Sequence, residues 1–407
     1  MNNKYWLKNA RLETGYKKEN ERVVETQTEL CHLLIEDGKI AKIIKAAEQR
    51  EDELPVKDAK GLLLLPSFIE KHVHLDKTYM GDAWRACIPA KGVIDRCNIE
   101  KNILASLLSS TQQRAEALLE VLLSYGSTHV RTHVDIYPEV KLQNLEGVQH
   151  ALETYSHKVS SEIVAFAQHG LLRPGTAELL REALRNGAGL VGAVDPATVD
   201  QNIEASLVQL MDLAVEGNAD IDLHLHDPGH LGTFTMKRLA ILTKEAGWEG
   251  RVAVSHAFGL GDVSREEAIE MAEILREAGI SIVTSLPIGR NIPPVNLLTE
   301  YGVEVAIGND NIYDSWWPTG NGDVFERAGR LIERCRWTDE VSLAQSLKYI
   351  TGGITPLNKE GSQVWPKEGD TANIVLVEAS CSAEAVARRS NRKAVFFQGN
   401  LVSGSLT

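Results

Sequence analysis

The chain has 407 residues, of which 43% are hydrophobic and 24% are charged, and its formal net charge is −13. This acidic balance repels phosphate backbones and anionic lipids, which argues against a nucleic-acid polymer as a partner. No apolar run reaches the roughly 20 residues that cross a bilayer, and residues 1–12 lack the pattern of a secretory signal. We therefore expect a cytoplasmic protein without a membrane partner, for which a small heterocycle remains a candidate ligand.

Both ends of the sequence predict β-structure. Residues 1–61 alternate short apolar runs with turn signals, and Asp37-Gly38 between two such runs indicates a hairpin. Residues 363–407 have the same pattern, with an apolar run over 373–377. We expect the two ends to build one small β-sandwich domain from an N-terminal and a C-terminal part.

The central residues, 62–362, alternate short β-rich runs with longer helical stretches, which is typical of repeated βα units and a parallel sheet. Eight candidate strands cover residues 62–74, 127–134, 162–168, 190–194, 221–226, 251–256, 280–284 and 303–309. Apolar spacing predicts helices over 102–123, 203–215 and 264–278, the last with Ser264 and Glu267 as a capping box. Since eight strands close a barrel, the predicted fold class is α/β, a (β/α)8 TIM-type barrel.

Candidate catalytic side chains cluster at the C-terminal ends of these strands, which form the active-site face of such a barrel. The residues are His72, His74, His133, Asp135, Gln168, His224, His226, Asp227, His256 and Asp310. His72 and His74 share one face of their strand, and two neutral imidazoles there are natural ligands for Zn²⁺ or Fe²⁺. Taken alone, the pair also fits two solvated histidines. No histidine follows His256, so a later ligand must be a carboxylate or water.

Asp310 follows the last predicted strand and is a candidate for that carboxylate. A buried aspartate is costly unless a cation is near it, which favours a ligand. The alternative is an aspartate that caps a turn or a helix. His226 stands where the chain turns toward Pro228-Gly229, and we interpret it as structural.

Residues 58–74 resemble the first barrel strand of the amidohydrolase superfamily, and the later histidines and Asp310 match its order and spacing. Four segments, 72–77, 131–135, 164–168 and 254–256, resemble bacterial cytosine deaminase. Two positions differ from that enzyme, because Asp227 replaces a glutamate and Asn311 replaces a second aspartate. Both differences resemble N-isopropylammelide amidohydrolase. The resemblance therefore implies a pyrimidine or triazine substrate rather than cytosine in particular.

The resemblance also implies residue roles. His72, His74, His224 and Asp310 would bind one divalent metal ion, Zn²⁺ or Fe²⁺, that activates water. His256 would polarise or deprotonate that water, so that His256 and Asp310 both take part in catalysis.

A second set of residues would act on the substrate. Asp227 would carry a proton to the ring nitrogen or the leaving amine. Gln168 can donate and accept hydrogen bonds at once, which suits the amide edge of a pyrimidine or triazine. The residues expected to bind substrate are Gln168, Lys77, Asn311 and Trp316, with Trp317 as the alternative stacking residue.

The function predicted from these residues is metal-dependent hydrolytic deamination of a small nitrogen heterocycle. Two alternatives stay open. A ring-opening cyclic amidohydrolase of the dihydroorotase or hydantoinase kind usually has a carboxylated lysine late in a middle strand, and segments 162–168 and 190–194 contain none. A barrel that binds a metal or ligand without turnover needs no proton carriers such as Asp227 and His256. The sequence does not decide between a monomer and a homo-oligomer.

Overall fold

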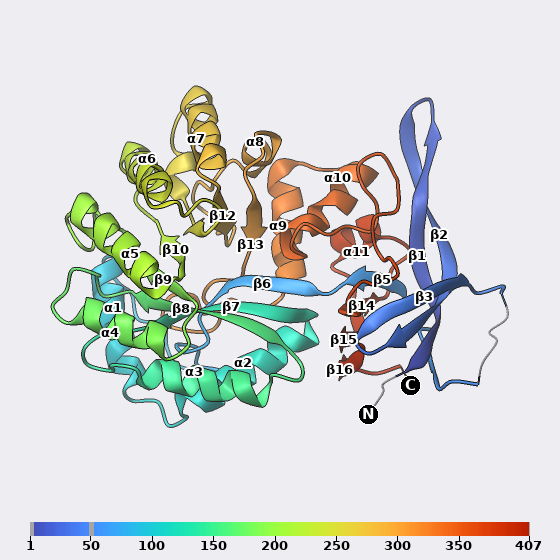
Figure 1. The fold of residues 1–407 in the computed structure, drawn as a ribbon, viewed down its shortest axis with the longest axis horizontal. Coiled ribbons are helices and arrows are strands. Elements are labelled where there is room, and N and C mark those ends of the chain that lie inside the picture. The colour runs from blue at the N-terminus through green and yellow to red at the C-terminus, as the bar shows by residue number, and fades with distance from the viewer. Residues whose placement is uncertain (1–3, 49–52, 407) are drawn as a thin grey trace.

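The computed structural model describes residues 4–48 and 53–406 and has two parts, a barrel and a second sheet (Figure 1). Within these residues, eight parallel strands form the barrel in chain order. They are β6 (Phe68–Val73), β7 (Ser127–Asp135), β8 (Ser160–Ala167), β9 (Leu190–Ala193), β10 (Asp220–His224), β11 (Val252–Ser255), β12 (Ile280–Thr284) and β13 (Val305–Ile307). A parallel bridge between Val73 and Asp310 joins the first strand to the segment after the last. The barrel is therefore nearly closed, and the predicted fold class is confirmed.

Helices connect the strands, and most of them lie around the barrel (Figure 1). They are α1 (Val93–Leu104), α2 (Thr111–Ser124), α3 (Gln143–Thr154), α4 (Thr176–Arg185), α5 (Ile203–Gly217), α6 (Gly229–Ala246), α7 (Arg265–Glu277), α8 (Val295–Glu300), α9 (Val324–Cys335), α10 (Glu340–Gln345) and α11 (Ser382–Arg388). The prediction of one helix over 102–123 was wrong. The chain leaves the helix after Leu104, Leu108 is 96% exposed, and Ser110 with Gln113 forms a capping box that begins a new helix.

The two chain ends share the second sheet, which we call the end sheet. Its strands are β1 (Tyr5–Glu19), β2 (Arg22–Glu36), β3 (Lys39–Lys45), β4 (Val56–Asp58), β5 (Leu63–Pro66), β14 (Ile374–Val377), β15 (Arg392–Phe397) and β16 (Asn400–Gly404). Strand β5 lies between β1 and β14 and so joins the two ends. The predicted hairpin at Asp37-Gly38 is confirmed, with φ of 48° and 78° at its two turn residues.

The run over residues 62–74, predicted as one barrel strand, is two strands. Residues 63–66 pair with β14 in the end sheet, and the barrel strand begins at Phe68. The backbone N–H of Ser67 donates to Asn373 and that of Phe68 donates to Gly126, so the chain changes sheet at this point. Both strands are buried, which makes the run continuously apolar and hides the break from the sequence pattern.

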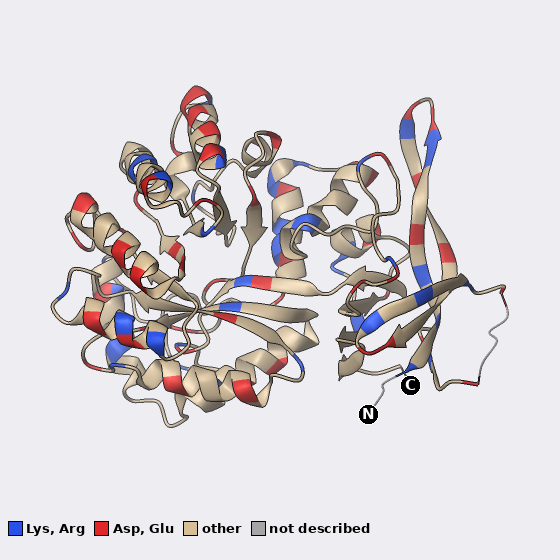
Figure 2. Cartoon of the chain, viewed as in Figure 1, with Lys and Arg blue, Asp and Glu red and all other residues tan. Residues whose placement is uncertain are grey.

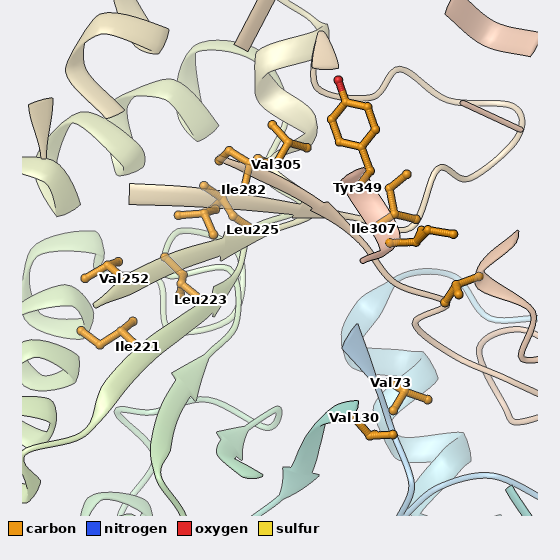
Figure 3. Close-up of a cluster of buried hydrophobic side chains, with 14 of the residues drawn as sticks. Val73, Val130, Ile221, Leu223, Leu225, Val252, Ile282, Val305, Ile307 and Tyr349 are labelled. Atoms are coloured by element: carbon orange, nitrogen blue, oxygen red, sulfur yellow. The ribbon is translucent and has the colours of Figure 1, made fainter. Parts of the chain in front are cut away.

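Apolar and polar residues alternate along the barrel strands, so that the apolar core and the polar barrel interior lie on opposite faces of each strand. In β10, Ile221 and Leu223 point into the apolar cluster between the strands and the helices (Figure 3). Asp222 and His224 alternate with them and therefore face the barrel interior. The same strands thus bury apolar side chains on one face and present polar groups on the other.

Ion pairs link neighbouring outer helices, and Figure 2 shows charged residues of both signs along them. The pairs are Arg181–Glu216, Arg238–Glu204, Lys237–Glu270 and Lys244–Glu277. Each is exposed and is worth about 0.2–1 kcal/mol at most. These charges do not determine the fold, which rests on the apolar core. Among the described residues, no helix is long and apolar enough to cross a membrane.

Candidate active site

Histidines from four barrel strands meet at the C-terminal end of the barrel. The five residues, all buried, are His72, His74, His133, His224 and His256. The ring centroids of His72 and His224 are 4.6 Å apart, and those of His74 and His224 are 5.5 Å apart. Asp310 faces the same cluster, with its Oδ1 3.6 Å from His72 Nε2 and 3.4 Å from His74 Nε2. The structure therefore brings together the four residues that the sequence assigned to a metal.

The donor atoms of this cluster fit a divalent ion. His72 Nε2 and both ring nitrogens of His224 and His256 are buried without a hydrogen-bond partner in the described part of the chain. Leaving a buried polar atom unpaired costs about 1–3 kcal/mol, so several together call for another partner. Two groups have ligand atoms within 4.8 Å of one another: His72, His74 and Asp310, and His72, His133 and His224. Imidazole and carboxylate at such spacing suit Zn²⁺ or Fe²⁺.

His133 is a cluster member that the sequence placed on the active-site face but not among the ligands. Its ring centroid is 4.0 Å from that of His72, and neither ring nitrogen has a hydrogen-bond partner in the described residues. Its Nε2 lies 3.8 Å from Asp222 Oδ2. Side chains alternate between the two faces of β7, and this alternation puts His133 on the same face as Arg131. It was the sequence signal that could have placed His133 in the cluster.

A chain of hydrogen bonds orients His72. Ser255 Oγ donates to Asp222 Oδ1 at 2.6 Å, and His72 Nδ1 lies 2.8 Å from the same Oγ. Because the serine proton goes to the carboxylate, Ser255 accepts the proton of His72 Nδ1. The lone pair of His72 then lies on Nε2, the atom that faces Asp310. Partners of this kind set the tautomer and the basicity of metal-binding histidines.

Replacing Ser255 with alanine should weaken metal binding roughly 10- to 100-fold, because His72 would lose the acceptor that fixes its tautomer. The measurement is the Zn²⁺ dissociation constant from competition with a chromophoric chelator. Ser281→Ala is the matched control, since Ser281 lies on the neighbouring strand β12 and its Oγ donates to the Val252 carbonyl at 3.5 Å rather than to a histidine of the cluster. Equal affinities of the two variants would contradict this role.

Burial and charge favour neutral histidines beside an ionised aspartate. Burial lowers the pKa of His72, His224 and His256, and it lowers that of His74 to about 3. Burial opposes ionisation of Asp310, but the surrounding histidines outweigh it and hold its pKa below the usual range. These are the protonation states that metal binding needs.

A cavity of about 350 Å³ opens above the cluster, within the range of small-molecule sites. It is lined by most of the predicted site residues, namely His74, Gln168, His224, His256, Asp310, Asn311, Trp316 and Trp317. Phe166 also lines it and stacks on His224 with ring centroids 4.1 Å apart. A planar apolar wall beside polar edges suits a heterocyclic ring.

Lys77 and Asp227 are not among the lining residues of this cavity. Lys77 is fully buried behind Gln168, where its Nζ donates to Asp135 at 3.0 Å and to the Gln168 carbonyl oxygen. Asp227 accepts a hydrogen bond from Thr198, and its Oδ2 is buried without a partner among the residues that the structure describes. Burial raises the pKa of Asp227, which favours its protonated form.

His226, which we interpreted as structural, lines the cavity. Its Nδ1 lies 2.9 Å from Asp195, and its ring stacks on His256 with centroids 4.3 Å apart. The side chain therefore supports His256 and also faces the ligand space.

Glu100 is a site residue that sequence reasoning missed. It lies on α1, and its side chain is buried. Its Oε1 accepts from Gln168 Nε2 at 2.7 Å and its Oε2 accepts from Trp316 Nε1 at 2.6 Å. Lys77 Nζ is 3.8 Å from Oε1. One carboxylate thus holds two cavity-lining side chains, although nothing in the sequence of α1 points to the barrel.

Comparison with known proteins identifies the family of the chain. A model of the amidohydrolase family matches residues 100–403. The uncharacterized protein YahJ of Escherichia coli (strain K12) is 39% identical over 99% of this chain and 88% of its own length. N-isopropylammelide isopropyl amidohydrolase of Pseudomonas sp. (strain ADP) is 33% identical over 85% of this chain and 87% of its own length.

A solved structure has the same fold along nearly the whole chain. N-isopropylammelide isopropylaminohydrolase from Burkholderia multivorans superposes with a TM-score of 0.86 at 30% sequence identity, and the match covers 98% of each chain. The resemblance found in the sequence is confirmed by these matches. The chain belongs to the amidohydrolase family and is a hydrolase of carbon–nitrogen bonds other than peptide bonds.

Proposed function

We propose that the protein catalyses metal-dependent hydrolytic deamination of a small nitrogen heterocycle of the pyrimidine or triazine type. The observation that carries the proposal is the cluster of unpartnered histidine nitrogens and Asp310 beneath a cavity of about 350 Å³. In the overall reaction, water supplies the oxygen that replaces the exocyclic amine on the ring carbon. The amine takes up one proton of the water and leaves as ammonia or an alkylamine, and the other proton stays on the product, on the new oxygen or on a ring nitrogen.

His72, His74, His224 and Asp310 would hold the divalent ion, which lowers the pKa of water toward about 7 and so supplies a nucleophile near neutral pH. His256 would move a proton at this point, because its Nδ1 is 4.0 Å from Asp310 Oδ2 and its Nε2 has no hydrogen-bond partner among residues 4–48 and 53–406. A neutral imidazole can accept a proton from the attacking water.

Asp227 would donate a proton to the ring nitrogen or the departing amine. The raised pKa and the unpartnered Oδ2 of Asp227 support this role. Since Asp227 does not line the cavity, we propose that the proton reaches the substrate through a water molecule.

Gln168 and Trp316 would select a flat ring with an amide-like edge. Gln168 has one N–H tied to Glu100 and its oxygen tied to Lys77, which leaves its second N–H and second lone pair for the ligand. The names of two relatives support a triazine, because both are hydrolases of N-isopropylammelide. Asn311 lines the same cavity and is held by Asp314, so it would contact the ring from the opposite strand end.

The test is release of ammonia or alkylamine from a panel of aminopyrimidines, pterins and aminotriazines by metal-loaded and chelator-stripped protein. We expect release from at least one ring, lost on stripping and restored by Zn²⁺ or Fe²⁺. Mass spectrometry of the product separates deamination, which keeps the ring, from ring opening, which adds water without losing an amine. Amine release that is equal before and after stripping would refute the metal-dependent mechanism.

A further inference from the structure

The mouth of the cavity carries an arginine, Arg290, whose guanidinium forms no ion pair or hydrogen bond with a side chain of the described residues, although Asp262 and Asp195 act on its charge from a longer distance. Arg290 lies between β12 and α8 and lines the cavity together with Ile288. Its guanidinium carbon is 3.7 Å from the centroid of the Phe258 ring. In the described part of the chain its one hydrogen bond is made by its backbone carbonyl, which accepts from Arg334. The guanidinium is therefore stacked on one face, and its N–H edges make no hydrogen bond to any residue that the structure describes.

Other charged groups of the cavity are already engaged. Arg327, the second arginine of the lining, donates to Asn309 Oδ1 at 3.2 Å and to the Ser285 carbonyl at 2.9 Å. Asp310 is the one carboxylate among the described lining residues, and it faces the histidines. The two carboxylates that act on Arg290 from a longer distance are also engaged, since Asp262 accepts from Asn291 and Gly229 and Asp195 lies 2.9 Å from His226 Nδ1.

The backbone around Arg290 is held in place. Arg334 on α9 donates to the carbonyls of Pro287 and Arg290 at 3.5 and 3.3 Å, and Asn291 donates to Asp262 at 2.8 Å. The Phe258 ring centroid is 5.4 Å from that of His256, so one aromatic ring separates the arginine from the histidine cluster. A charge in this position can contact a substituent of a ring whose reacting carbon lies over the cluster.

We propose that Arg290 is a binding site for an anionic oxygen substituent of the substrate, so that the preferred heterocycle carries a carboxylate. This inference rests on the proposed function and narrows its substrate class. A guanidinium binds a carboxylate through two parallel N–H···O bonds, and such charge-assisted bonds are stronger when the pair is partly shielded from water. Desolvation lowers the pKa of Arg290, the carboxylates of Asp262 and Asp195 oppose this shift, and arginine stays charged.

The test compares aminopyrimidine and aminotriazine carboxylates with their carboxamides, which keep the shape and remove the charge. We expect metal-loaded wild-type protein to prefer the carboxylate in kcat/KM by roughly 10- to 100-fold. In Arg290→Gln this ratio should fall to about one, mainly through a higher KM, and Arg290→Lys should restore part of it. The matched control is Arg276→Gln, because Arg276 is exposed on α7 and lies outside the cavity lining. A ratio that is the same in wild type and Arg290→Gln would overturn the inference.

A binding measurement separates this inference from the proposed function. Calorimetric titration of orotate, a pyrimidine carboxylate without an exocyclic amine, needs no turnover. Weaker binding of orotate to Arg290→Gln than to wild type would support the anion site even if no ring released an amine, in which case the proposed function alone would fail. Equal binding of orotate by the two proteins would count against the anion site whatever the activity.

Discussion

Asp310→Asn is expected to lower kcat/KM for amine release by at least about 10³-fold, the scale seen when a group that stabilises the transition state is removed. The substitution keeps the shape of the side chain and removes its charge. An amide would present either a weaker oxygen ligand or an N–H group to His72 and His74, whose Nε2 atoms lie 3.6 and 3.4 Å from the carboxylate. Bound metal should fall in parallel with activity.

Two measurements make this prediction specific to the site. Metal content after dialysis against a weak chelator should drop in Asp310→Asn and stay at the wild-type level in Asp212→Asn, which changes an exposed aspartate of α5. The thermal midpoint without metal should fall at neutral pH, because a carboxylate whose pKa is held below its usual range stabilises the folded state in its ionised form. If Asp310→Asn keeps both its metal and its turnover, Asp310 is neither a ligand nor a catalytic residue.

The barrel and the convergence of the histidines and Asp310 at its C-terminal end could be predicted because both depend on local periodicity. Alternate residues of a strand face opposite sides, and the C-terminal ends of parallel strands meet on one face. This is why His72, His74, His224 and Asp310 could be placed together from positions far apart in the sequence. The division of residues 62–74 between two sheets could not be predicted, because a strand that is buried in either sheet has the same apolar composition.

Residues beyond the strand ends were harder to place because their direction depends on loop geometry. The carboxylate of Asp195 accepts from the backbone N–H groups of His226 and Asp227 at 2.5 and 3.3 Å, and this contact from the preceding loop sets how the chain turns after β10. As a result His226 faces the cavity, whereas Asp227 lies beside Thr198. Neither outcome follows from the spacing of residues 224–227 alone.

Glu100 is a further residue whose place in the site could not be predicted from the sequence. Apolar periodicity predicts which face of a helix is buried, but α1 buries only Cys97 and Glu100 among its described residues. The partners of Glu100 come from the end of β8 and from the loop after β13. A buried carboxylate on a weakly amphipathic helix is thus visible as a site residue only when the tertiary contacts are known.

Glu100→Gln should lower kcat/KM roughly 10- to 100-fold although Glu100 does not line the cavity. Each carboxylate oxygen accepts one N–H, from Gln168 at 2.7 Å and from Trp316 at 2.6 Å. A glutamine offers one acceptor and places an N–H₂ group against the other donor. One of the two cavity side chains would then lose its partner, which costs about 1–3 kcal/mol, and each 1.4 kcal/mol is a tenfold change in rate or affinity.

A control variant and a double variant distinguish positioning of the cavity side chains by Glu100 from simple anchoring of α1. Cys97→Ala is the matched control, since Cys97 is the other buried residue of the helix and makes no bond to Gln168 or Trp316. If Glu100 acts by orienting these side chains, its loss should raise KM for the ring and shift tryptophan fluorescence, while Cys97→Ala changes thermal stability alone. The double variant with Gln168→Ala should be less than additive, because the removed amide is one of the two groups that Glu100 holds. Full additivity, or equal kinetic effects of Glu100→Gln and Cys97→Ala, would mean that Glu100 only fastens the helix to the barrel.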